Sequence, residues 1–226
     1  SKAKSLSRGE TAHLMKIVRG DTLEELGSAE FEKTAAAYDK LWLDIGTGDG
    51  SFAYQQARSH PAVLCVGLDP AWNNMSRMAS RAARRKTAAT NVLFVQGSVE
   101  DPPTELMGRA DFISINYPWS GLLRALVAPQ AAILGNVRAL ARAGAGIAVY
   151  LNLHVFQDEG LKEALALPAF DAEYVGNTLG PAYREKGLVI EGFKLCSDKL
   201  PVKTTWGSRL SLNSRRSSCF ILVRAV

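Results

Sequence analysis

The sequence predicts an α/β protein built on a mostly parallel sheet, and three observations support this prediction. Short apolar runs alternate along the chain with segments whose apolar residues recur at helical spacing. A glycine-rich turn directly follows the first of these runs, and a polar loop separates the last two. Strands that alternate with helices are typical of a parallel sheet covered by helices. The final pair indicates a hairpin, so we expect seven strands with an antiparallel strand at the edge.

The expected elements follow one another at regular intervals. The seven strands are Leu41 to Asp44, Val63 to Leu68, Val92 to Val95, Phe112 to Ile115, Ile147 to Leu151, Leu188 to Cys196 and Cys219 to Val223. Helical spacing predicts helices over Trp72 to Lys86, Gln130 to Arg142 and Pro181 to Lys186.

We expect a single domain over 1–226, because 226 residues with 47% hydrophobic content can bury one substantial core. Three segments lie outside the core pattern. The mixed-charge extension 1–40 could form a small hairpin or a helix packed against the sheet. The insertions 153–177 and 197–218 are long enough to be functional or disordered loops.

Composition limits the functional class. The net charge of +5 makes the chain a candidate for a polyanionic partner. Cys65, Cys196 and Cys219 are odd in number and lack the spacing of a metal site, so we expect buried thiols of a reducing cytoplasm and no metal. No run approaches the roughly 18 apolar residues of a membrane span, and 1–11 lacks the apolar stretch of a signal peptide. We therefore expect a cytoplasmic protein without a membrane partner.

The loop Asp44-Ile45-Gly46-Thr47-Gly48-Asp49-Gly50 carries the clearest chemical signal. Alternate glycines let the backbone turn tightly and let a ligand approach it closely. The G-x-G-x-G spacing is one residue tighter than that of dinucleotide pyrophosphate loops, which favours S-adenosylmethionine, whose ammonium group requires a carboxylate such as Asp44. The sequence therefore predicts a Rossmann-like, class I S-adenosylmethionine-dependent methyltransferase fold. The candidate cofactor contacts in this loop are Asp44, Gly46, Thr47, Gly48 and Gly50.

Two later strand ends extend the candidate cofactor site. Asp69 and Pro70 end the second strand, where a carboxylate can accept hydrogen bonds from both ribose hydroxyls. After the third strand, Ser98, Val99 and Glu100 would flank the adenine ring. A glycine-rich turn after a strand is often only a turn, but the three features in this order favour a cofactor site.

The fourth strand leads into Ile115-Asn116-Tyr117-Pro118-Trp119, and the carboxyl ends of central strands form the ligand crevice of such sheets. Proline fixes the backbone, and an exposed tryptophan offers a flat face on which a base can stack. The alternative is that Trp119 packs under the following helix. Asn116 is a further candidate cofactor contact. It also gives a partial match to the Asn-Pro-Pro-aromatic motif of enzymes that methylate exocyclic amines, with Tyr117 in place of the first proline.

Three stretches together resemble a known family: Asp44 to Gly50, Tyr117-Pro118-Trp119-Ser120 with Leu122-Leu123 after it, and Trp206-Gly207-Ser208-Arg209-Leu210. They are similar to the aminoglycoside-resistance methyltransferases of 16S ribosomal RNA, of the kanamycin-apramycin (KamB/NpmA) type. The likeness runs from about Tyr38 to the end of the chain. This chain has Tyr-Pro-Trp-Ser where the family often has Phe-Pro-Trp-Gly, and Ser214 where another basic residue is expected.

The resemblance implies methyl transfer from S-adenosylmethionine to N1 of a decoding-site adenine in the assembled 30S subunit. Two tryptophans of that family sandwich the flipped adenine, and these roles carry over to Trp119, with Pro118 before it, and to Trp206. The resemblance also implies that Thr204 lines the methionine end of the cofactor. The residues it implies at the RNA backbone are Arg209, Arg215 and Arg216.

A run of arginines could provide further contacts with RNA. If Trp72 to Lys86 is helical, the arginines share one face and apolar residues occupy the other. A charged stripe is often only a solvated face, but the basic charge and the family's use of a basic segment here favour phosphate contacts. The stripe consists of Arg77, Arg81, Arg84 and Arg85, and the last three are the candidates.

Methylation of adenine N1 needs no general base, because no proton leaves. The three histidines, His13, His60 and His154, have no recognisable partner and are expected to be structural. Other functions compatible with the sequence are a transfer RNA methyltransferase, an exocyclic-amine (N6-adenine) nucleic-acid methyltransferase, and a non-catalytic RNA-binding module. We expect a monomer.

Overall fold

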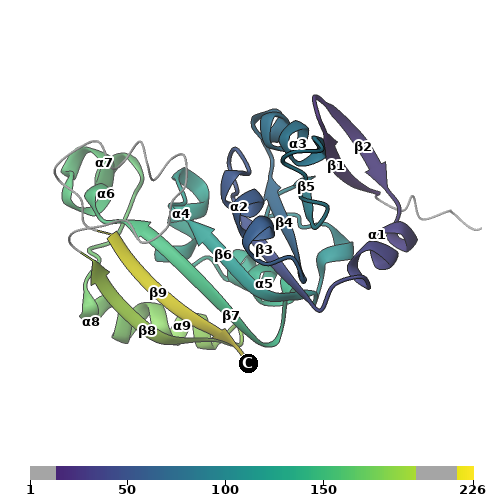
Figure 1. Ribbon diagram of the computed structural model, residues 1–226. Coiled ribbons are helices and arrows are strands. Elements are labelled where there is room, and N and C mark those ends of the chain that lie inside the picture. The colour runs from purple at the N-terminus through teal and green to yellow at the C-terminus, as the bar shows by residue number, and fades with distance from the viewer. Residues whose placement is uncertain (1–13, 197–217) are drawn as a thin grey trace, which may run out of the picture.

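The computed structural model describes residues 14–196 and 218–226, which form one continuous nine-stranded sheet with helices on both faces (Figure 1). The strand order is β2-β1-β5-β4-β3-β6-β7-β9-β8. The strands are β1 (Met15–Arg19), β2 (Thr22–Leu26), β3 (Lys40–Ile45), β4 (Val63–Asp69), β5 (Val92–Gln96), β6 (Ala110–Asn116), β7 (Ala141–Asn152), β8 (Leu188–Cys196) and β9 (Ser218–Ala225).

The seven predicted strands, β3 to β9, form the expected methyltransferase sheet. Strands β3 to β7 pair in parallel, and β9 pairs antiparallel with both β7 and β8. The expected terminal hairpin and the antiparallel last strand are confirmed, since β9 pairs antiparallel with both of its neighbours. The last strand does not lie at the edge, however, because β9 is inserted between β7 and the edge strand β8. The edge strand β8 carries exposed Glu191 and Lys194, charges of the kind that keep sheet edges from pairing with other chains.

The N-terminal extension forms both of the alternatives that the sequence left open. Strands β1 and β2 form an antiparallel hairpin, and β1 also pairs antiparallel with β5, which extends the sheet from seven strands to nine. Helix α1 (Ser28–Ala35) follows and buries Phe31 completely. The apolar side chains of Met15 and Ile17 join the main core, so this part of the extension belongs to the sheet.

The helices divide between the two faces of the sheet. Residues of α2 and α3 pack with Val18 and Phe94 in one core cluster, whereas residues of α1, α4, α5 and α9 pack in the other. The helices after α1 are α2 (Ser51–Ser59), η1 (Trp72–Met75), α3 (Ser76–Ala83), η2 (Thr104–Leu106), α4 (Ser120–Val127), α5 (Ala131–Leu140), α6 (His154–Gln157), α7 (Glu159–Ala164), α8 (Ala172–Tyr174), η3 (Val175–Leu179) and α9 (Gly180–Arg184).

Three predicted segments differ from the structure. The predicted helix over Trp72 to Lys86 ends at Ala83, where Arg84 becomes extended, and the Thr87 hydroxyl donates to the Arg81 carbonyl, one of the unpaired acceptors at the helix end. The helix predicted to Arg142 ends at Leu140, where β7 begins. The segment 153–177 is not a loop, because it folds into α6, α7, α8 and the start of η3. Its Phe156 and Phe170 stack with ring centroids 4.7 Å apart.

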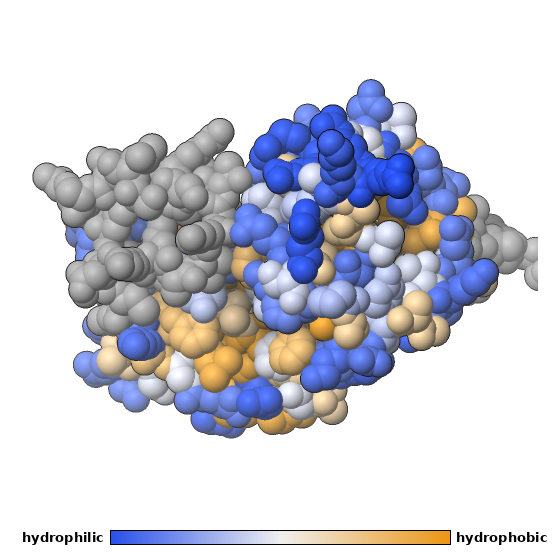
Figure 2. All heavy atoms as spheres, in the orientation of Figure 1, coloured by the Kyte–Doolittle hydropathy of each residue, from blue (hydrophilic) through white to orange (hydrophobic). Residues whose placement is uncertain are grey.

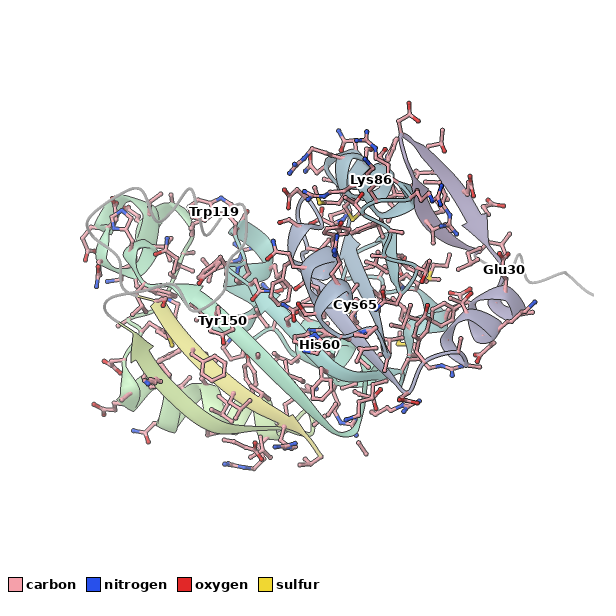
Figure 3. All side chains as sticks on the ribbon, viewed as in Figure 1. Glu30, His60, Cys65, Lys86, Trp119 and Tyr150 are labelled. Atoms are coloured by element: carbon pink, nitrogen blue, oxygen red, sulfur yellow. The ribbon has the colours of Figure 1, made fainter. Side chains whose placement is uncertain are left out.

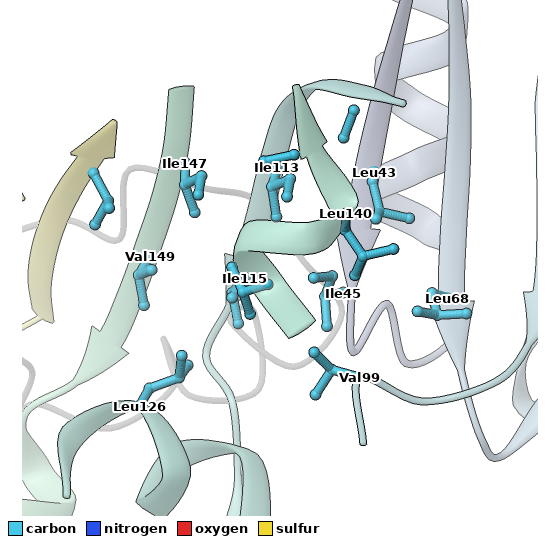
Figure 4. Packing of buried hydrophobic residues seen from close by; sticks show 14 of the residues in the cluster. Leu43, Ile45, Leu68, Val99, Ile113, Ile115, Leu126, Leu140, Ile147 and Val149 are labelled. Atoms are coloured by element: carbon cyan, nitrogen blue, oxygen red, sulfur yellow. The ribbon is translucent and has the colours of Figure 1, made fainter. Parts of the chain in front are cut away.

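The larger core cluster fixes which face of the central strands is polar. Leu43 and Ile45 of β3 and Ile113 and Ile115 of β6 all point into this core (Figure 4). Because successive strand residues point to opposite faces, the residues between them face α2. Those residues include Asp44 and Ser114.

Among the described residues, no helix combines the length and apolarity needed to cross a membrane.

The connection between β6 and α4 contains two residues with unusual backbone geometry. Tyr117 and Ser120 both have a φ of 50°, on either side of Pro118-Trp119. Positive φ is costly for residues that have a Cβ atom, and proline further disfavours helical conformations in the residue before it. Backbone strain of this kind is concentrated at functional sites. Ser120 stands where glycine, which lacks this cost, is common in the family that the sequence resembles.

We predict that Ser120→Gly increases the free energy of unfolding by about 0.5–1 kcal/mol, because relief of the positive φ exceeds the added entropy of an unfolded glycine. Urea unfolding measures the change. Ser76→Gly is the matched control, since Ser76 has an ordinary φ of −52° and its replacement should destabilise the protein. Equal destabilisation by both changes would contradict the prediction.

Candidate functional site

A cavity of about 820 Å³ opens at the carboxyl ends of β3, β4, β5 and β6. The strand order reverses at β3, because β4 and β5 follow on one side of it and β6 and β7 on the other. Ligands bind at such a reversal point in open α/β sheets. Most of the predicted site residues in the described ranges line it. They are Asp44, Gly46, Thr47, Gly48, Asp69, Pro70, Ser98, Val99, Glu100, Asn116, Pro118 and Trp119.

The glycines of the first loop serve different purposes. Gly46, Gly48 and Gly50 all have positive φ, of 70°, 62° and 74°. A Cβ atom on Gly48 would meet nothing within 4 Å, and this residue lines the cavity. Gly50 does not line the cavity. A Cβ atom there would lie 2.5 Å from Cε1 of Phe94, so Gly50 is needed for the turn into α2 and for packing on β5.

The side chain of Asp44 is the polar centre of the site. It is only 2% exposed and accepts three hydrogen bonds from the protein's own side chains. Thr47 Oγ1 donates to Oδ2 at 2.6 Å, while Ser114 Oγ and Asn116 Nδ2 donate to Oδ1 at 2.6 and 2.9 Å. These donors come from the glycine loop and from β6, so the carboxylate ties the loop to the neighbouring strand.

The environment of Asp44 also changes its acidity. The pKa of Asp44 is raised to about 6: burial is the main cause, the hydrogen bonds from Ser114, Thr47 and Asn116 lower the pKa, and the charge of Asp69 raises it. Without the three donors, burial would favour the neutral acid more strongly. The carboxylate therefore carries its charge near neutral pH because of these donors.

Asp69 fixes the glycine loop from the end of β4. Its Oδ2 accepts a hydrogen bond from the Gly48 amide and its Oδ1 accepts one from the Ala71 amide, both at 2.9 Å. Each oxygen keeps a second lone pair, and the residue lines the cavity. It therefore places negative charge at the cavity wall while it anchors Gly48.

The turn after β5 is held by a residue that the sequence reasoning missed. Asn136 of α5 donates from Nδ2 to the carbonyls of Val99 and Glu100, at 2.8 and 3.1 Å. Val99 is buried. These bonds fix the backbone of the loop that was expected to flank an adenine ring. No local signal marks Asn136, because its partners lie more than 35 positions earlier.

Asn116 provides a test of whether a cationic ligand fits the cavity. Its Nδ2 donates to Asp44, which leaves Oδ1 as a buried acceptor with no hydrogen-bond partner among the described residues. A buried acceptor without a partner is costly. Because Asn116 lines the cavity beside the Asp44 carboxylate, the two residues together suit a ligand that brings N–H donors and positive charge, such as the ammonium group of S-adenosylmethionine.

Trp119, which Figure 3 labels, lines the cavity and, because its side chain is exposed, lies at the cavity mouth. It is 46% exposed, so the alternative that it packs under the following helix is not what the structure contains. Pro118 precedes it within the strained connection. The other predicted substrate and cofactor residues of the C-terminal part lie outside the described residues. They are Trp206, Thr204, Arg209, Arg215 and Arg216.

A basic groove, defined as the hollow lined by Arg77, Met78, Arg81, Arg84, Arg85, Lys86 and Thr87, lies next to the cavity. Figure 2 shows strongly hydrophilic surface over α3, where Figure 3 labels Lys86. Arg84 and Arg85 reach this groove from the turn after α3 and not from a shared helical face, so the helical argument for them was wrong. Arg77 lines both the groove and the cavity, where it forms an ion pair with Asp49 at 3.2 Å.

The cavity wall also contains residues that the sequence reasoning did not select. Phe52 and Asn74 are examples, and they lie at the start of α2 and in η1. Their position follows from where the helices begin after strand ends, which composition does not indicate. Of the histidines, His60 and His154 lie within the described residues, and neither lines the cavity.

Comparison with known proteins agrees with this arrangement. A family model, NpmA: 16S rRNA (adenine(1408)-N(1))-methyltransferase, matches residues 16–225. Proteins named 16S rRNA (adenine(1408)-N(1))-methyltransferase are similar over most of both chains. The one from Streptoalloteichus hindustanus is 30% identical over 89% of this chain and 94% of its own, and the one from Escherichia coli is 29% identical over 90% and 95%.

Solved structures give the same result. A variant of the 16S rRNA (adenine(1408)-N(1))-methyltransferase from Catenulisporales acidiphilia, with its cosubstrate S-adenosylmethionine, superposes with a TM-score of 0.87 at 31% identity, covering 94% of this chain and 97% of that one. The 16S rRNA methyltransferase KamB superposes with a TM-score of 0.84 at 29% identity, covering 93% and 99%. The fold, the glycine loop and the match over 16–225 lead to one conclusion: this chain belongs to the NpmA family of S-adenosylmethionine-dependent 16S rRNA (adenine(1408)-N(1))-methyltransferases.

Proposed function

We propose that this protein transfers the methyl group of S-adenosylmethionine to N1 of adenine 1408 in 16S ribosomal RNA and thereby confers aminoglycoside resistance. The observation that carries the proposal is the position of Trp119. It stands exposed at the mouth of a cavity whose floor holds Asp44 and Asp69. An aromatic face next to a cofactor cavity is where a flipped base can be held for reaction.

The chemistry requires positioning more than proton transfer. The lone pair of adenine N1 forms a bond to the methyl carbon while the bond from that carbon to the sulfonium sulfur breaks. No proton leaves, and the positive charge passes from sulfur to the base. The protein would hold the base in line, and the π face of Trp119 would favour its developing charge.

The cofactor would be held by residues at the ends of four strands, β3 to β6. Asp44 and Asn116 would receive the ammonium group, and Asp69 would accept hydrogen bonds from the ribose hydroxyls. The loop from Ser98 to Glu100, fixed by Asn136, would flank the adenine ring. Trp206 and Thr204 remain proposals from the resemblance for the second stacking face and the methionine end.

We further propose that the substrate is the assembled 30S subunit and that the protein acts as a cytoplasmic monomer with one methyltransferase domain. The basic groove supports contact with folded ribosomal RNA, since cations there can neutralise several phosphates at once. Arg209, Arg215 and Arg216 would extend this contact around the flipped nucleotide.

A second candidate function has one specific observation in its favour. The acceptor Oδ1 of Asn116 has no partner among the described residues, and it could bind the exocyclic amino group of adenine instead of the cofactor. In that case the product would be N6-methyladenine. Reverse transcription distinguishes the two products, because methylation at N1 blocks base pairing whereas a single N6-methyl group permits it.

The first experiment incubates the protein with labelled S-adenosylmethionine and 30S subunits and maps the product by reverse transcription. We expect a new stop at adenine 1408. The Trp119→Ala variant should lose about fivefold or more in turnover, since stacking is worth about 1–3 kcal/mol per base, and should retain cofactor affinity. Trp119→Phe, which keeps an aromatic face, should retain more activity. Loss of cofactor affinity in Trp119→Ala, measured by calorimetry, would contradict the assigned role.

We predict that Asp69→Ala weakens the binding of S-adenosylmethionine by about tenfold or more, because it removes both the proposed ribose acceptor and the anchor of the Gly48 amide. Isothermal titration calorimetry measures the change. Asp101→Ala, which removes an exposed carboxylate outside the cavity, is the control and should bind normally. Unchanged affinity in Asp69→Ala would remove Asp69 from the cofactor site.

We predict that the double change Arg84→Glu and Arg85→Glu weakens binding to 30S subunits and lowers the salt dependence of binding, because fewer counterions are released. Binding is measured from 50 to about 200 mM salt. The control reverses the same number of exposed charges away from the groove, at Lys33 and Arg184. If the two double variants change the affinity for 30S subunits and its salt dependence equally, the groove is only a solvated surface.

A further inference from the structure

We propose that Ser114, held by Trp42, is a positioning residue that keeps the Asp44 side chain in its ionised form and thereby sets how low the pH can fall before cofactor binding weakens. Neither Ser114 nor Trp42 lines the cavity, so both would act through Asp44. The inference rests on the proposed contact between Asp44 and the ammonium group of the cofactor.

The sheet register places these side chains together. In the parallel pairing of β3 with β6, Asp44 lies opposite Ser114 and Trp42 lies opposite Phe112. Because Trp42 and Asp44 are two residues apart on one strand, they point to the same face, as do Phe112 and Ser114. All four side chains therefore lie on the face of the sheet that α2 covers.

The hydrogen bonds among these residues have one direction. The indole Nε1 of Trp42 is a donor only, and it donates to Ser114 Oγ at 3.1 Å. With one lone pair of that oxygen occupied, the hydroxyl hydrogen of Ser114 is free to donate to Asp44 Oδ1, 2.6 Å away. Ser114 is 2% exposed, so bulk water does not compete for its hydroxyl. The bond from Trp42 therefore leaves Ser114 to act as a hydrogen-bond donor to the Asp44 carboxylate.

The indole of Trp42 is itself fixed by its neighbours. It packs edge-on against Phe52 of α2 with centroids 6.0 Å apart, and lies 5.8 Å from Phe112 and 5.7 Å from His60. Aromatic packing of this kind holds a ring in one orientation. The Nε1 donor thus stays aimed at Ser114.

The electrostatic surroundings of Asp44 make the hydrogen bond from Ser114 important for keeping the carboxylate ionised. The pKa of Asp44 is raised to about 6, mainly by burial, and among the three hydrogen bonds that lower it the one from Ser114 has the largest effect. Asp69 on β4 adds a like charge. The thiol of Cys65 on β4 stays neutral, since burial and the charge of Asp44 raise its pKa to about 12. The remaining charged residues that line the cavity are Asp49, Arg77 and Glu100.

The direction of the pH effect follows from the charge of the ligand. An ammonium group binds the ionised carboxylate, so affinity falls as the pH falls through the pKa of Asp44 in the free protein. Loss of the Ser114 donor would raise that pKa further. The fall in affinity would then begin at a higher pH, whereas well above both pKa values the two proteins would bind alike.

The test measures the dissociation constant of S-adenosylmethionine for the full chain by calorimetry between pH 5.5 and 8.5. For Ser114→Ala, a rise of about one unit in the Asp44 pKa would give about fivefold weaker binding than the wild type at pH 6 and less than twofold at pH 8.5. Comparing variant with wild type at each pH cancels the titration of the ligand's own amino group. Trp42→Phe keeps the aromatic packing and should shift the profile in the same direction by less.

Two controls separate the outcomes. Tyr183→Phe removes a buried hydroxyl that donates to the Leu126 carbonyl; neither residue lines the cavity, so the pH profile of this variant should match the wild type. Asp44→Asn should bind S-adenosylmethionine weakly at every pH, without the further loss of affinity at low pH that the wild type shows. If the ratio of the dissociation constants of Ser114→Ala and the wild type does not change with pH, this inference is overturned, even if Asp44→Asn loses affinity. Wild-type affinity in Asp44→Asn would instead overturn the proposed role of Asp44 in cofactor binding.

Discussion

The buried carboxylate of Asp44 is the constraint on which the rest of the site depends. A charge at 2% exposure is stable only if the protein supplies donors, and Thr47, Ser114 and Asn116 supply three. Because those donors belong to the glycine loop and to β6, satisfying the charge also fixes the loop against the neighbouring strand. The same bonds leave the acceptor oxygen of Asn116 at the cavity wall, so stability and ligand recognition share one network.

Strain and charge are placed around this centre in a way that suits a large nucleic-acid substrate. The positive φ angles of Tyr117 and Ser120 turn the chain sharply on either side of Trp119 and leave that indole exposed at the cavity mouth. Arg77 lines both the cavity at the strand ends and the basic groove. The surface proposed to hold RNA phosphates is therefore continuous with the surface proposed to hold the cofactor.

The sequence predicted the parts of the site that are local and missed those that depend on distant partners. Asp44 and Asp69 could be found because polar residues at the ends of apolar strands mark one edge of a parallel sheet. Ser114 could not, since its role arises from a register with Asp44 that joins positions 70 apart. The insertion of β9 between β7 and β8 likewise depends on pairing between distant strands and not on local sequence. Arg84 was placed correctly at a basic surface for a wrong reason, because helix α3 stops before it.

The Asp44 network is proposed to receive the amino group of the cofactor. A crystal structure with S-adenosylhomocysteine, the demethylated product, tests this most directly. We expect the product's amino group to lie within hydrogen-bonding distance of Asp44 or of Asn116 Oδ1, with the donors from Thr47 and Ser114 retained. An amino group bound elsewhere in the cavity, with Asn116 Oδ1 still lacking a partner, would contradict it.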